Sequence, residues 1–230
     1  MPVLDVPPPA FMQDPEIQMF ADAANRFFER AAPPQRVAGW RDAGQVERAF
    51  WRETGAAGFL GVMVPEAYGG PGADFRHELV LLDVAARQNL EGFALGLHNV
   101  IITPYIILHG TEEQKQRWLP KLVSGERVSA IAMSEPGAGS DLQSIRTTAR
   151  RDGDGFRING SKTFISNGQV ADFIVVVAKT DPTLGSRGVS LLIVETDQVQ
   201  GFRRGKKLDK IGLDAQMVCR LRKACQACSS

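Results

Sequence analysis

The chain has 230 residues, of which 43% are hydrophobic and 23% charged, and its formal net charge is +1. This length is sufficient to bury a core in one large or two small domains, and the near-neutral charge argues against nucleic-acid binding. No apolar run is long enough to span a membrane, because Pro104 interrupts the run 99–108. Acidic Asp5, Asp14 and Glu16 stand where a targeting segment would be basic. We therefore expect a cytoplasmic protein rather than a mitochondrial precursor.

The hydrophobic pattern is helical from Asp14 to about Ser124. Asp14 and Pro15 suit the N-cap and first positions of a helix, which Pro33 and Pro34 would end. Similar signals predict helices near 45–55, 76–88, 93–108 and 112–123, the last with Thr111 as its N-cap.

From Val128 onward the hydrophobic period changes to two and turns become frequent. Asp-Gly and Asn-Gly pairs, which are typical of tight hairpin turns, separate the alternating segments. The pattern predicts strands over 129–133, 144–151, 155–158, 162–165, 173–178, 189–194 and 202–208. The expected fold class is therefore α+β, with an all-α part followed by an all-β part.

Two short motifs lie in the β-rich part, AMSEPGAGSD at 132–141 and TFISNG at 163–168. Gly137 and Gly139 lack a Cβ, which suits close approach to a ligand or a positive φ. Hydroxyl and backbone N–H donors fixed there would stabilise the negative charge that a flavin gains on reduction. Each motif alone has a simpler interpretation, the first as a surface turn and the second as part of a core.

Two other nucleotide motifs fail on their spacing. Leu142 stands at the third glycine position of a dinucleotide-binding fingerprint, and Ser161 stands at the lysine position of a P-loop. The interpretation as a flavin site therefore depends on both motifs occurring together.

In order and spacing, the two motifs resemble the signature and the flavin-covering strand of the acyl-CoA dehydrogenase family. The segments GFLGVMVPEAYGG at 58–70 and KLDKIGL at 207–213 resemble that family as well. Many relatives carry Trp at the position of Phe164, and Phe there indicates a long-chain-type relative.

The resemblance implies an FAD site and an acyl-CoA substrate. Ser134 and the backbone around Met133 match the positions facing the pyrimidine end of the flavin. Ser166 matches the hydroxyl that bonds flavin N5, and Phe164 matches the aromatic lying against the ring. The implied flavin-binding residues are Ile131, Ala132, Met133, Ser134, Glu135, Pro136, Gly137, Ala138, Gly139, Ser140, Phe164, Ile165 and Ser166. The implied substrate-binding residues are Ser140, Ser186 and Arg187, the last two beside the CoA moiety.

The resemblance also implies an architecture and partners. The family has an all-α N-terminal domain, a small antiparallel β-barrel and a C-terminal four-helix domain, and its full-length members are homo-oligomers. We expect residues 1–127 and 128–214 to form the first two, with the third absent and 215–230 a divergent, disordered tail. Electron-transfer flavoprotein is the implied electron acceptor.

The family reaction is α,β-dehydrogenation of an acyl-CoA thioester, with hydride transfer to flavin N5. Its general base is a glutamate of the C-terminal domain, so we predict no catalytic residue here and expect this truncated chain to be inactive alone. Glu135, which precedes Pro136 in a turn, is interpreted as a structural carboxylate.

The stretch 217–230 departs from the family pattern and holds all 3 cysteines. We interpret it as foreign to the fold, the result of a frame change or a premature end. Cys225 and Cys228, with Cys219, could hold zinc, but a fourth ligand is missing because the histidines lie in the helical part. Those histidines, read as structural and not as metal ligands, are His77, His98 and His109.

Two functional hypotheses remain open. The chain is a flavin-dependent acyl-CoA dehydrogenase, or an oxidase variant of the same class such as acyl-CoA oxidase or nitroalkane oxidase. Alternatively, it is a non-catalytic product with only a partial flavin-binding surface.

Overall fold

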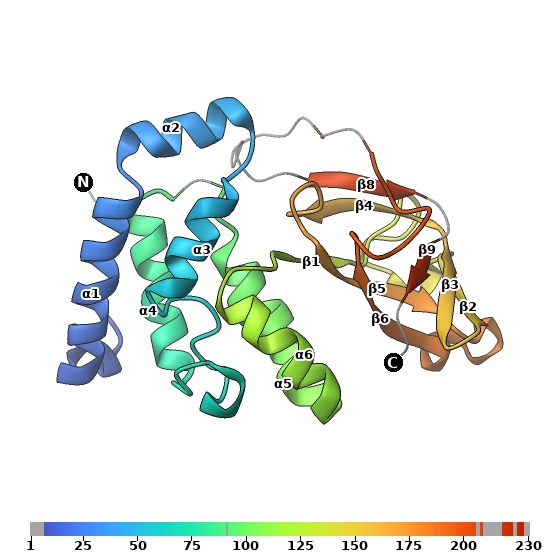
Figure 1. Ribbon diagram of the computed structural model, residues 1–230, viewed down its shortest axis with the longest axis horizontal. Helices are drawn as coiled ribbons and strands as arrows, with labels where there is room; N and C mark the ends of the chain where they lie inside the picture. The colour runs from blue at the N-terminus through green and yellow to red at the C-terminus, as the bar shows by residue number, and fades with distance from the viewer. Residues whose placement is uncertain (1–6, 91, 206–207, 209–217, 223–224, 228–230) are drawn as a thin grey trace.

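The computed structural model describes residues 7–90, 92–205, 208, 218–222 and 225–227, the last two ranges by their backbone only. The α-helices all come before the strands in the chain, and the two kinds of element lie at opposite ends of the molecule in Figure 1. This arrangement confirms the expected α+β class. We call the two ends the helical part and the β part.

The helices begin and end largely where local signals place them. Asp14 caps α1 by accepting the backbone N–H of Glu16, and Thr111 caps α6 in a reciprocal box with Gln114. Pro33 follows the C-cap of α1, and Pro34 occupies the first turn of an unpredicted helix, where its missing N–H costs nothing. The α-helices are α1 (Pro15–Ala31), α2 (Pro34–Ala43), α3 (Arg48–Ala56), α4 (Phe75–Arg87), α5 (Thr103–His109) and α6 (Glu112–Val123).

The predicted helix 93–108 contains in its middle a π-helical turn, η3 (Leu97–Ile102), which leads into α5. Pro104 lies near the start of α5 and removes one backbone donor from the helical ladder. The Thr103 hydroxyl donates to the carbonyl of His98 over 2.6 Å, which helps to satisfy the irregular turn. The remaining short helical turns are 3₁₀: η1 (Ala10–Gln13), η2 (Glu66–Tyr68), η4 (Leu142–Ser144) and η5 (Pro182–Gly188).

The strands form one sheet of six and one of three. The first has the order β1-β5-β2-β3-β9, with β6 beside β5, and the second has the order β4-β8-β7. The strands are β1 (Ser129–Ala132), β2 (Thr148–Asp152), β3 (Gly155–Asn159), β4 (Ser161–Ser166), β5 (Phe173–Lys179), β6 (Val189–Glu195), β7 (Arg203–Arg204), β8 (Val218–Arg222) and β9 (Cys225–Ala227).

The expectation of a purely antiparallel β part is wrong. β5 runs parallel to β1 and, over one residue pair, parallel to β2, while it is antiparallel to β6. Alternation of apolar residues predicts a strand but not its direction, which depends on where the chain returns to the sheet. The pairing within these two sheets does not confirm a closed barrel.

The stretch expected to be a disordered tail contains β8 and β9. β8 pairs with β4 and β7, and β9 pairs with β3, all antiparallel. The side chains of Cys219, Cys225 and Cys228 lie outside the described residues, and so does the zinc alternative that depends on them.

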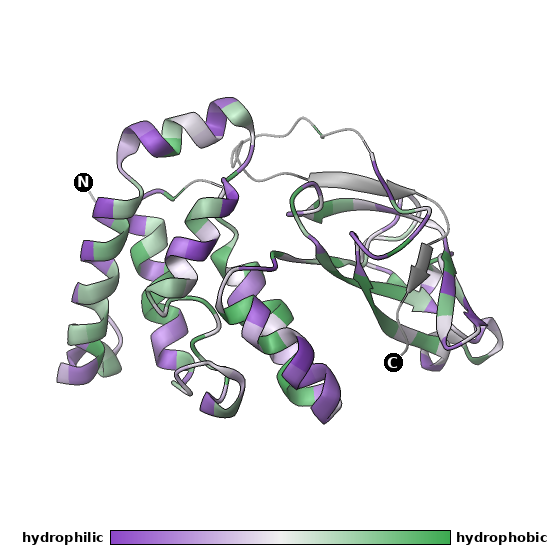
Figure 2. Ribbon diagram, in the orientation of Figure 1, coloured by the Kyte–Doolittle hydropathy of each residue, from purple (hydrophilic) through white to green (hydrophobic). Residues whose placement is uncertain are grey.

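The buried core is continuous between the two parts. One apolar cluster combines Ile106 and Trp118 of the helical part with Ile131 and Phe173 of the β part. Separate clusters fill the helix bundle and the interior of the sheets. Figure 2 shows hydrophobic colouring along β1 and β5, and nearly all residues of these two strands are buried.

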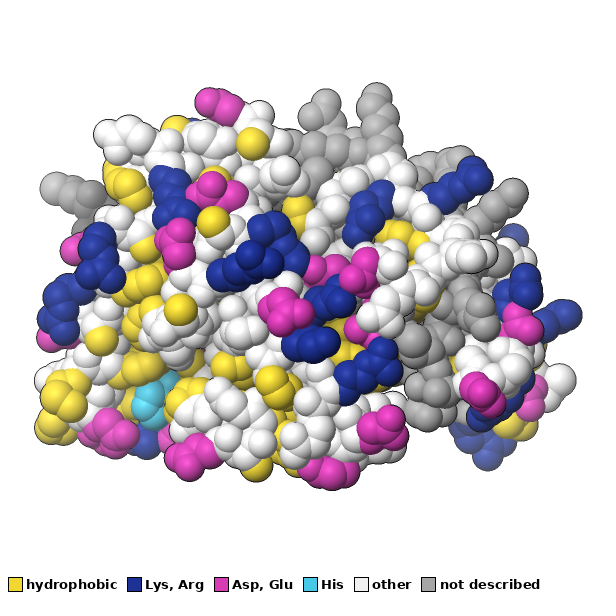
Figure 3. All heavy atoms as spheres, in the orientation of Figure 1, with side chains coloured by type: hydrophobic (Ala, Val, Ile, Leu, Met, Phe, Trp, Pro, Cys, Tyr) yellow, Lys and Arg dark blue, Asp and Glu magenta, His cyan; other side chains and the backbone are white. Residues whose placement is uncertain are grey.

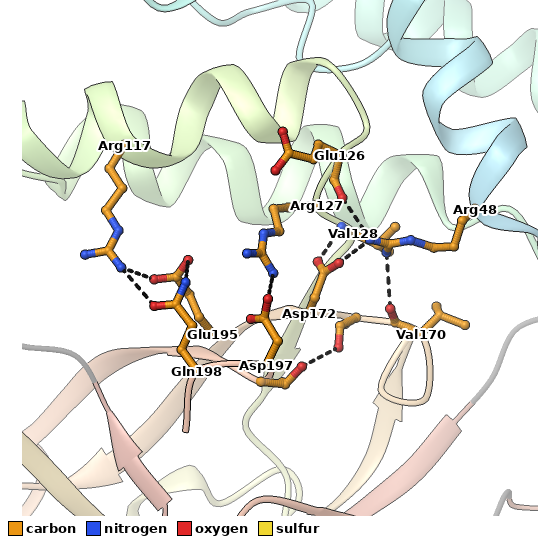
Figure 4. A network of polar contacts seen from close by, with 12 residues as sticks. Arg48, Arg117, Glu126, Arg127, Val128, Val170, Asp172, Glu195, Asp197 and Gln198 are labelled. Carbon is orange, nitrogen blue, oxygen red and sulfur yellow. Dashed lines mark hydrogen bonds and ion pairs between the residues drawn. The ribbon is translucent and has the colours of Figure 1, made fainter. Parts of the chain in front are cut away.

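Charged side chains reinforce this junction. In Figure 4, three arginines on the helical side reach three carboxylates of the β part, and Figure 3 shows both charge types interspersed across the middle of the molecule. The Asp172 carboxylate also accepts the Val128 N–H over 2.8 Å. The ion pairs are Arg48 with Asp172, Arg117 with Glu195, and Arg127 with Asp197.

Within the described residues, the helices are too short or too polar to cross a lipid bilayer.

Candidate functional site

The first motif forms a tight loop that leaves the end of β1. Glu135 and Ala138 exchange two backbone hydrogen bonds of 2.9 and 3.1 Å, which fold the chain back over Pro136 and Gly137. Pro136, Gly137, Gly139 and Ser140 are exposed on this loop, whereas Ala138 is buried. The loop therefore presents backbone and small side chains to solvent while one residue anchors it.

The two glycines of this loop do not use the backbone freedom that glycine allows. Neither Gly137 nor Gly139 adopts a positive φ, and no heavy atom lies within 4 Å of the place where a Cβ would stand. Of the two alternatives, a positive φ therefore applies to neither glycine, and the space beside each is open to the close approach of a ligand.

The second motif contains an irregular backbone at Phe164. The register of β4 against β8 shifts between Lys162 and Ile165, and Phe164 has φ of 58°. A positive φ is rare for a bulky residue and persists only where the surroundings impose it. In a regular strand, Lys162 and Phe164 would point to the same face. Here Lys162 is buried and the Phe164 ring is 70% exposed, because the bulge re-aims it.

The two motifs are hydrogen-bonded to each other. The Thr163 N–H donates to the Ser134 carbonyl over 2.9 Å, and the Lys162 ammonium donates to the Met133 carbonyl over 2.8 Å. The start of β4 therefore lies directly against the start of the loop. Of the predicted residues, these bonds bring the backbone of Met133 and Ser134 close to that of Phe164. Ile131, Ala132 and Ile165 are buried.

The Glu135 carboxylate is buried and hydrogen-bonded within the protein. Its carboxylate accepts the N–H groups of Arg146 over 2.6 Å and Thr147 over 3.0 Å, and lies 2.9 Å from the Lys162 ammonium. Burial alone would raise the pKa of Glu135, but these donors hold it below its ordinary value. These contacts support the interpretation of Glu135 as a structural carboxylate.

Two hydroxyls of the motifs have no hydrogen-bond partner among the residues that the structure describes. Ser134 and Ser166 are half-buried, and neither side chain makes a hydrogen bond to any other part of the chain that the structure describes. Unpaired hydroxyls next to an exposed aromatic ring provide both the donors and the stacking surface that a flavin ring requires. The residues present therefore fit the implied cofactor.

The predicted CoA-contacting residues lie in the turn η5. Ser186 and Arg187 are exposed there, beside Gly185, which has φ of 57° and ψ of −127°. Val189, which follows this turn, packs against the cluster that contains Ala138 and touches Met133. The end of η5 is therefore connected to the signature loop through packed apolar side chains.

Sequence reasoning missed Lys162 and Asn167 as residues that position the motifs. The Asn167 amide donates to the carbonyl of Ser129 over 3.2 Å and has φ of 60°. Both residues are 2% exposed. The Asn-Gly pair indicated a turn at Asn167, but nothing in the sequence distinguishes Lys162 from a surface lysine of a strand.

His98 occupies a structural position. His98 is fully buried, with Nε2 3.0 Å from the Leu122 carbonyl and Nδ1 2.8 Å from the Ser129 hydroxyl. Burial lowers its pKa to about 4, so the ring is neutral near pH 7. Among the described residues, no group of His, Cys, Asp and Glu side chains has the arrangement of a metal site.

A cavity of about 300 Å³ lies apart from the motif residues, between α5–α6 and β5–β6. Its walls include Tyr105, His109, Trp118 and Ile193. Tyr105 and Ile193 pack against the same apolar cluster as Met133.

Two family models match the chain. The model for the N-terminal domain of acyl-CoA dehydrogenase matches residues 14–126, and the model for the middle domain matches residues 130–223. The second match includes β8, in the stretch that was expected to be foreign to the fold.

A curated relative agrees with these matches. The chain is 41% identical over 203 residues to the mitochondrial long-chain specific acyl-CoA dehydrogenase of Sus scrofa. That match covers 87% of this chain and 47% of the relative, so the chain spans about half the length of this relative.

Solved structures show the same likeness. Acyl-CoA dehydrogenase from Geobacillus kaustophilus is similar with a TM-score of 0.88 and 47% identity, covering 94% of this chain and 57% of that one. Acyl-CoA dehydrogenase complexed with FAD from Bacillus anthracis is similar with a TM-score of 0.81 and 31% identity, covering 92% and 36%. With two family models that together match most of its residues, the chain belongs to the acyl-CoA dehydrogenase family.

Proposed function

We propose that this chain provides the flavin-facing and thioester-facing surfaces of an enzyme that dehydrogenates acyl-CoA substrates with FAD. The observation that carries this proposal is the hydrogen bond between the Thr163 N–H and the Ser134 carbonyl. It joins the two motifs, which carry the exposed Phe164 ring and two half-buried hydroxyls that have no hydrogen-bond partner among the described residues.

The proposed cofactor site uses residues 131–140 and 164–166. The backbone near Met133 and the Ser134 hydroxyl would hold the pyrimidine end of the flavin, and the Ser166 hydroxyl would donate to N5. Phe164 would cover the ring. When bound, FAD supplies the acceptor for a hydride from the β-carbon of an acyl-CoA thioester.

The proposed substrate site uses Ser140, Ser186 and Arg187. Arg187 is exposed and carries the positive charge that a CoA phosphate would meet. Ser140 would face both the flavin and the thioester. Long-chain substrates are favoured by the relative named above, and electron-transfer flavoprotein is the proposed electron acceptor, as the family resemblance implies.

The proton acceptor of the reaction is not proposed to be Glu135. That carboxylate is almost fully buried and is held by two N–H groups and an ammonium, so it has neither the access nor the basicity of a general base.

We propose residues 1–127 and 128–214 as the two domains of the chain and, for the whole protein, a homo-oligomer. A cytoplasmic location remains a prediction, since the Sus scrofa relative is mitochondrial.

The test is to purify the chain, add FAD and record the visible absorbance after removing free cofactor. Retained yellow colour is expected, and its loss on adding long-chain acyl-CoA would report reduction. Retained flavin without reduction would agree with the proposal for this chain alone, because none of its residues is proposed as the general base. No retained flavin would contradict the proposal.

Ser166→Ala gives a residue-level check in any form of the protein that is reduced by substrate. Loss of a donor to the developing charge is expected to slow flavin reduction by an amount equivalent to about 2–4 kcal/mol. Ser161→Ala, on the same strand but outside the predicted site, is the matched control and should leave the reduction rate unchanged.

A further inference from the structure

The Lys162 side chain lies at the contact between the two motifs. It is 2% exposed, and its ammonium is 2.8 Å from the Met133 carbonyl oxygen and 2.9 Å from Glu135 Oε1. Glu135 is 8% exposed and lies on the loop, whereas Lys162 lies on β4. One buried charge pair therefore joins the segment that contains Ser134 to the segment that contains Phe164 and Ser166.

Burying this pair opposes folding unless its bonds are well formed. Removing an ammonium and a carboxylate from water costs several kcal/mol each, and apolar side chains of similar volume often replace such pairs without loss of stability. Every bond of the pair also has a geometric consequence. Lys162 fixes the Met133 carbonyl, next to Ser134. Glu135 fixes the N–H groups of Arg146 and Thr147, which directly precede β2.

The same pair constrains the strained part of β4. Phe164 is two residues from Lys162 and holds φ of 58° at the register shift. An anchor on one side of a strained residue prevents the backbone from relaxing toward an ordinary strand, which would turn the Phe164 ring away from its exposed position.

We propose that Lys162 and Glu135 are positioning residues that set the spacing between Ser134 on the loop and Phe164 and Ser166 on β4. This spacing determines how tightly the site binds a flavin ring. The inference rests on the proposed function, because it assigns the purpose of the spacing to FAD. Neither residue touches the cofactor in this account. Both act through the backbone groups that they hold.

Variants of the full chain separate positioning from folding. Lys162→Met alone leaves the Glu135 carboxylate buried without its cation and is expected to destabilise the fold strongly. Lys162→Met/Glu135→Gln removes both charges at similar volume and is expected to recover much of the lost stability. It still lacks the donor to the Met133 carbonyl.

The measurements are the melting temperature, the Kd for FAD by fluorescence titration, and the visible spectrum of the bound flavin. We expect the double variant to fold but to bind FAD about tenfold more weakly, with a shifted flavin absorbance band. Amide hydrogen exchange at Thr163 without FAD should also accelerate, because its acceptor is the Ser134 carbonyl and the neighbouring Met133 carbonyl is no longer held by Lys162.

A matched control is Arg117→Met/Glu195→Gln, which removes another pair with a buried carboxylate, at the junction between the two parts. It should change stability but leave the flavin Kd and spectrum unchanged. Lys162→Arg is a conservative test, since it keeps the charge but cannot place one compact ammonium between two acceptors. Compared with Lys162→Met, the Lys162→Arg variant should regain most of the lost stability but little of the lost FAD affinity.

The outcomes distinguish this inference from the function on which it rests. If the wild-type chain binds FAD, and the folded double variant binds it equally well with the same spectrum, the pair is only structural and the inference is wrong. If the wild-type chain does not bind FAD, the proposed function fails. In that case, an unchanged amide exchange rate at Thr163 in the double variant would also reject the positioning role. A faster exchange rate would show that the pair positions the loop against β4, without a role in flavin binding.

Discussion

The Asn99 carboxamide and the Glu78 carboxylate lie 3.1 Å apart, from Nδ2 to Oε2, in the interior of the helical part. The same amide donates to the Phe59 carbonyl over 3.0 Å and accepts the Gly61 N–H over 3.0 Å. One side chain therefore connects α4, the loop before η2 and the π-helical turn. Glu78 is 0% exposed, and its second oxygen has no partner among the described residues.

Burial raises the pKa of Glu78 to about 7 from an ordinary value of 4.5, while the bond from Asn99 opposes the rise. The folded chain thus binds this proton more tightly than the unfolded chain, so stability falls as pH rises from the unfolded pKa through the folded one. Glu78→Gln removes this titration. Relative to wild type, its free energy of unfolding should rise by about 2–3 kcal/mol between about pH 5 and about pH 8.

Denaturant unfolding at several pH values checks this prediction. Glu66→Gln, at an exposed position of η2, is the control and should show no such pH-dependent gain. A constant difference between Glu78→Gln and wild type across the pH range would show that Glu78 does not titrate there.

Phe164 allows a comparison of two truncations at one strained position. Both Phe164→Ala and Phe164→Gly remove a ring that is 70% exposed, so little apolar burial is lost. Only glycine relieves the positive φ, and Phe164→Gly should be more stable than Phe164→Ala by about 1 kcal/mol. Both should weaken FAD binding if the ring covers the flavin. Equal stability of the two variants would argue against strain at Phe164.

Gly125 and Gly153 both have a positive φ but differ in their surroundings. A Cβ on Gly125 would stand 2.2 Å from the Trp51 carbonyl oxygen, whereas nothing lies within 4 Å of one on Gly153. Gly153→Ala should cost about 1 kcal/mol from the backbone alone. Gly125→Ala should cost at least about 2 kcal/mol more, because the α3 backbone must move. Thermal unfolding of the two variants measures the difference, and similar costs would contradict it.

The junction between the two parts should depend on Arg48. Its guanidinium pairs with Asp172 and donates to the carbonyls of Glu126 over 2.8 Å and Val170 over 3.3 Å. Arg48→Met leaves a carboxylate that is 17% exposed without its cation, and we expect a loss of about 1–3 kcal/mol. Adding Asp172→Asn should recover part of it.

The control for this prediction is Arg87→Met, which breaks the exposed pair of Arg87 with Asp83 within α4. It should change the free energy of unfolding by less than about 0.5 kcal/mol. If Arg48→Met and Arg87→Met behave alike, the junction does not depend on its charges.

Features set by neighbouring residues could be predicted from the sequence. The caps at Asp14 and Thr111 depend on side chains within three residues, and both are found where the pattern places them. Strand positions follow from alternation. The direction of β5 beside β1 could not be predicted, since it depends on residues about forty positions apart. The helix α2 was missed because consecutive prolines signal an end as well as a beginning.

The sequence proposes flavin-facing residues, which stay a prediction, but it gives no signal for the residues that hold them in position. Ser134, Phe164 and Ser166 were identified by the resemblance of their motifs. Lys162 has no such signal, because the spacing of a lysine on a strand does not show that a carbonyl and a carboxylate will meet it from another segment. The positive φ of Phe164 was likewise unpredictable, since an aromatic residue in an alternating segment ordinarily indicates a regular strand.

The bonds that shape the signature loop also set an order of events during synthesis. The groups that hold Glu135 and the Met133 carbonyl come from Arg146, Thr147 and Lys162, all of which leave the ribosome after the loop itself. The helical part precedes them, and its main apolar cluster lies almost wholly between Ile17 and Leu95, so its contacts are closer in sequence and can form earlier. The loop can therefore reach its final geometry only once β4 has emerged and docked, so a nascent chain that stops short of Lys162 would have folded helices and an unformed site.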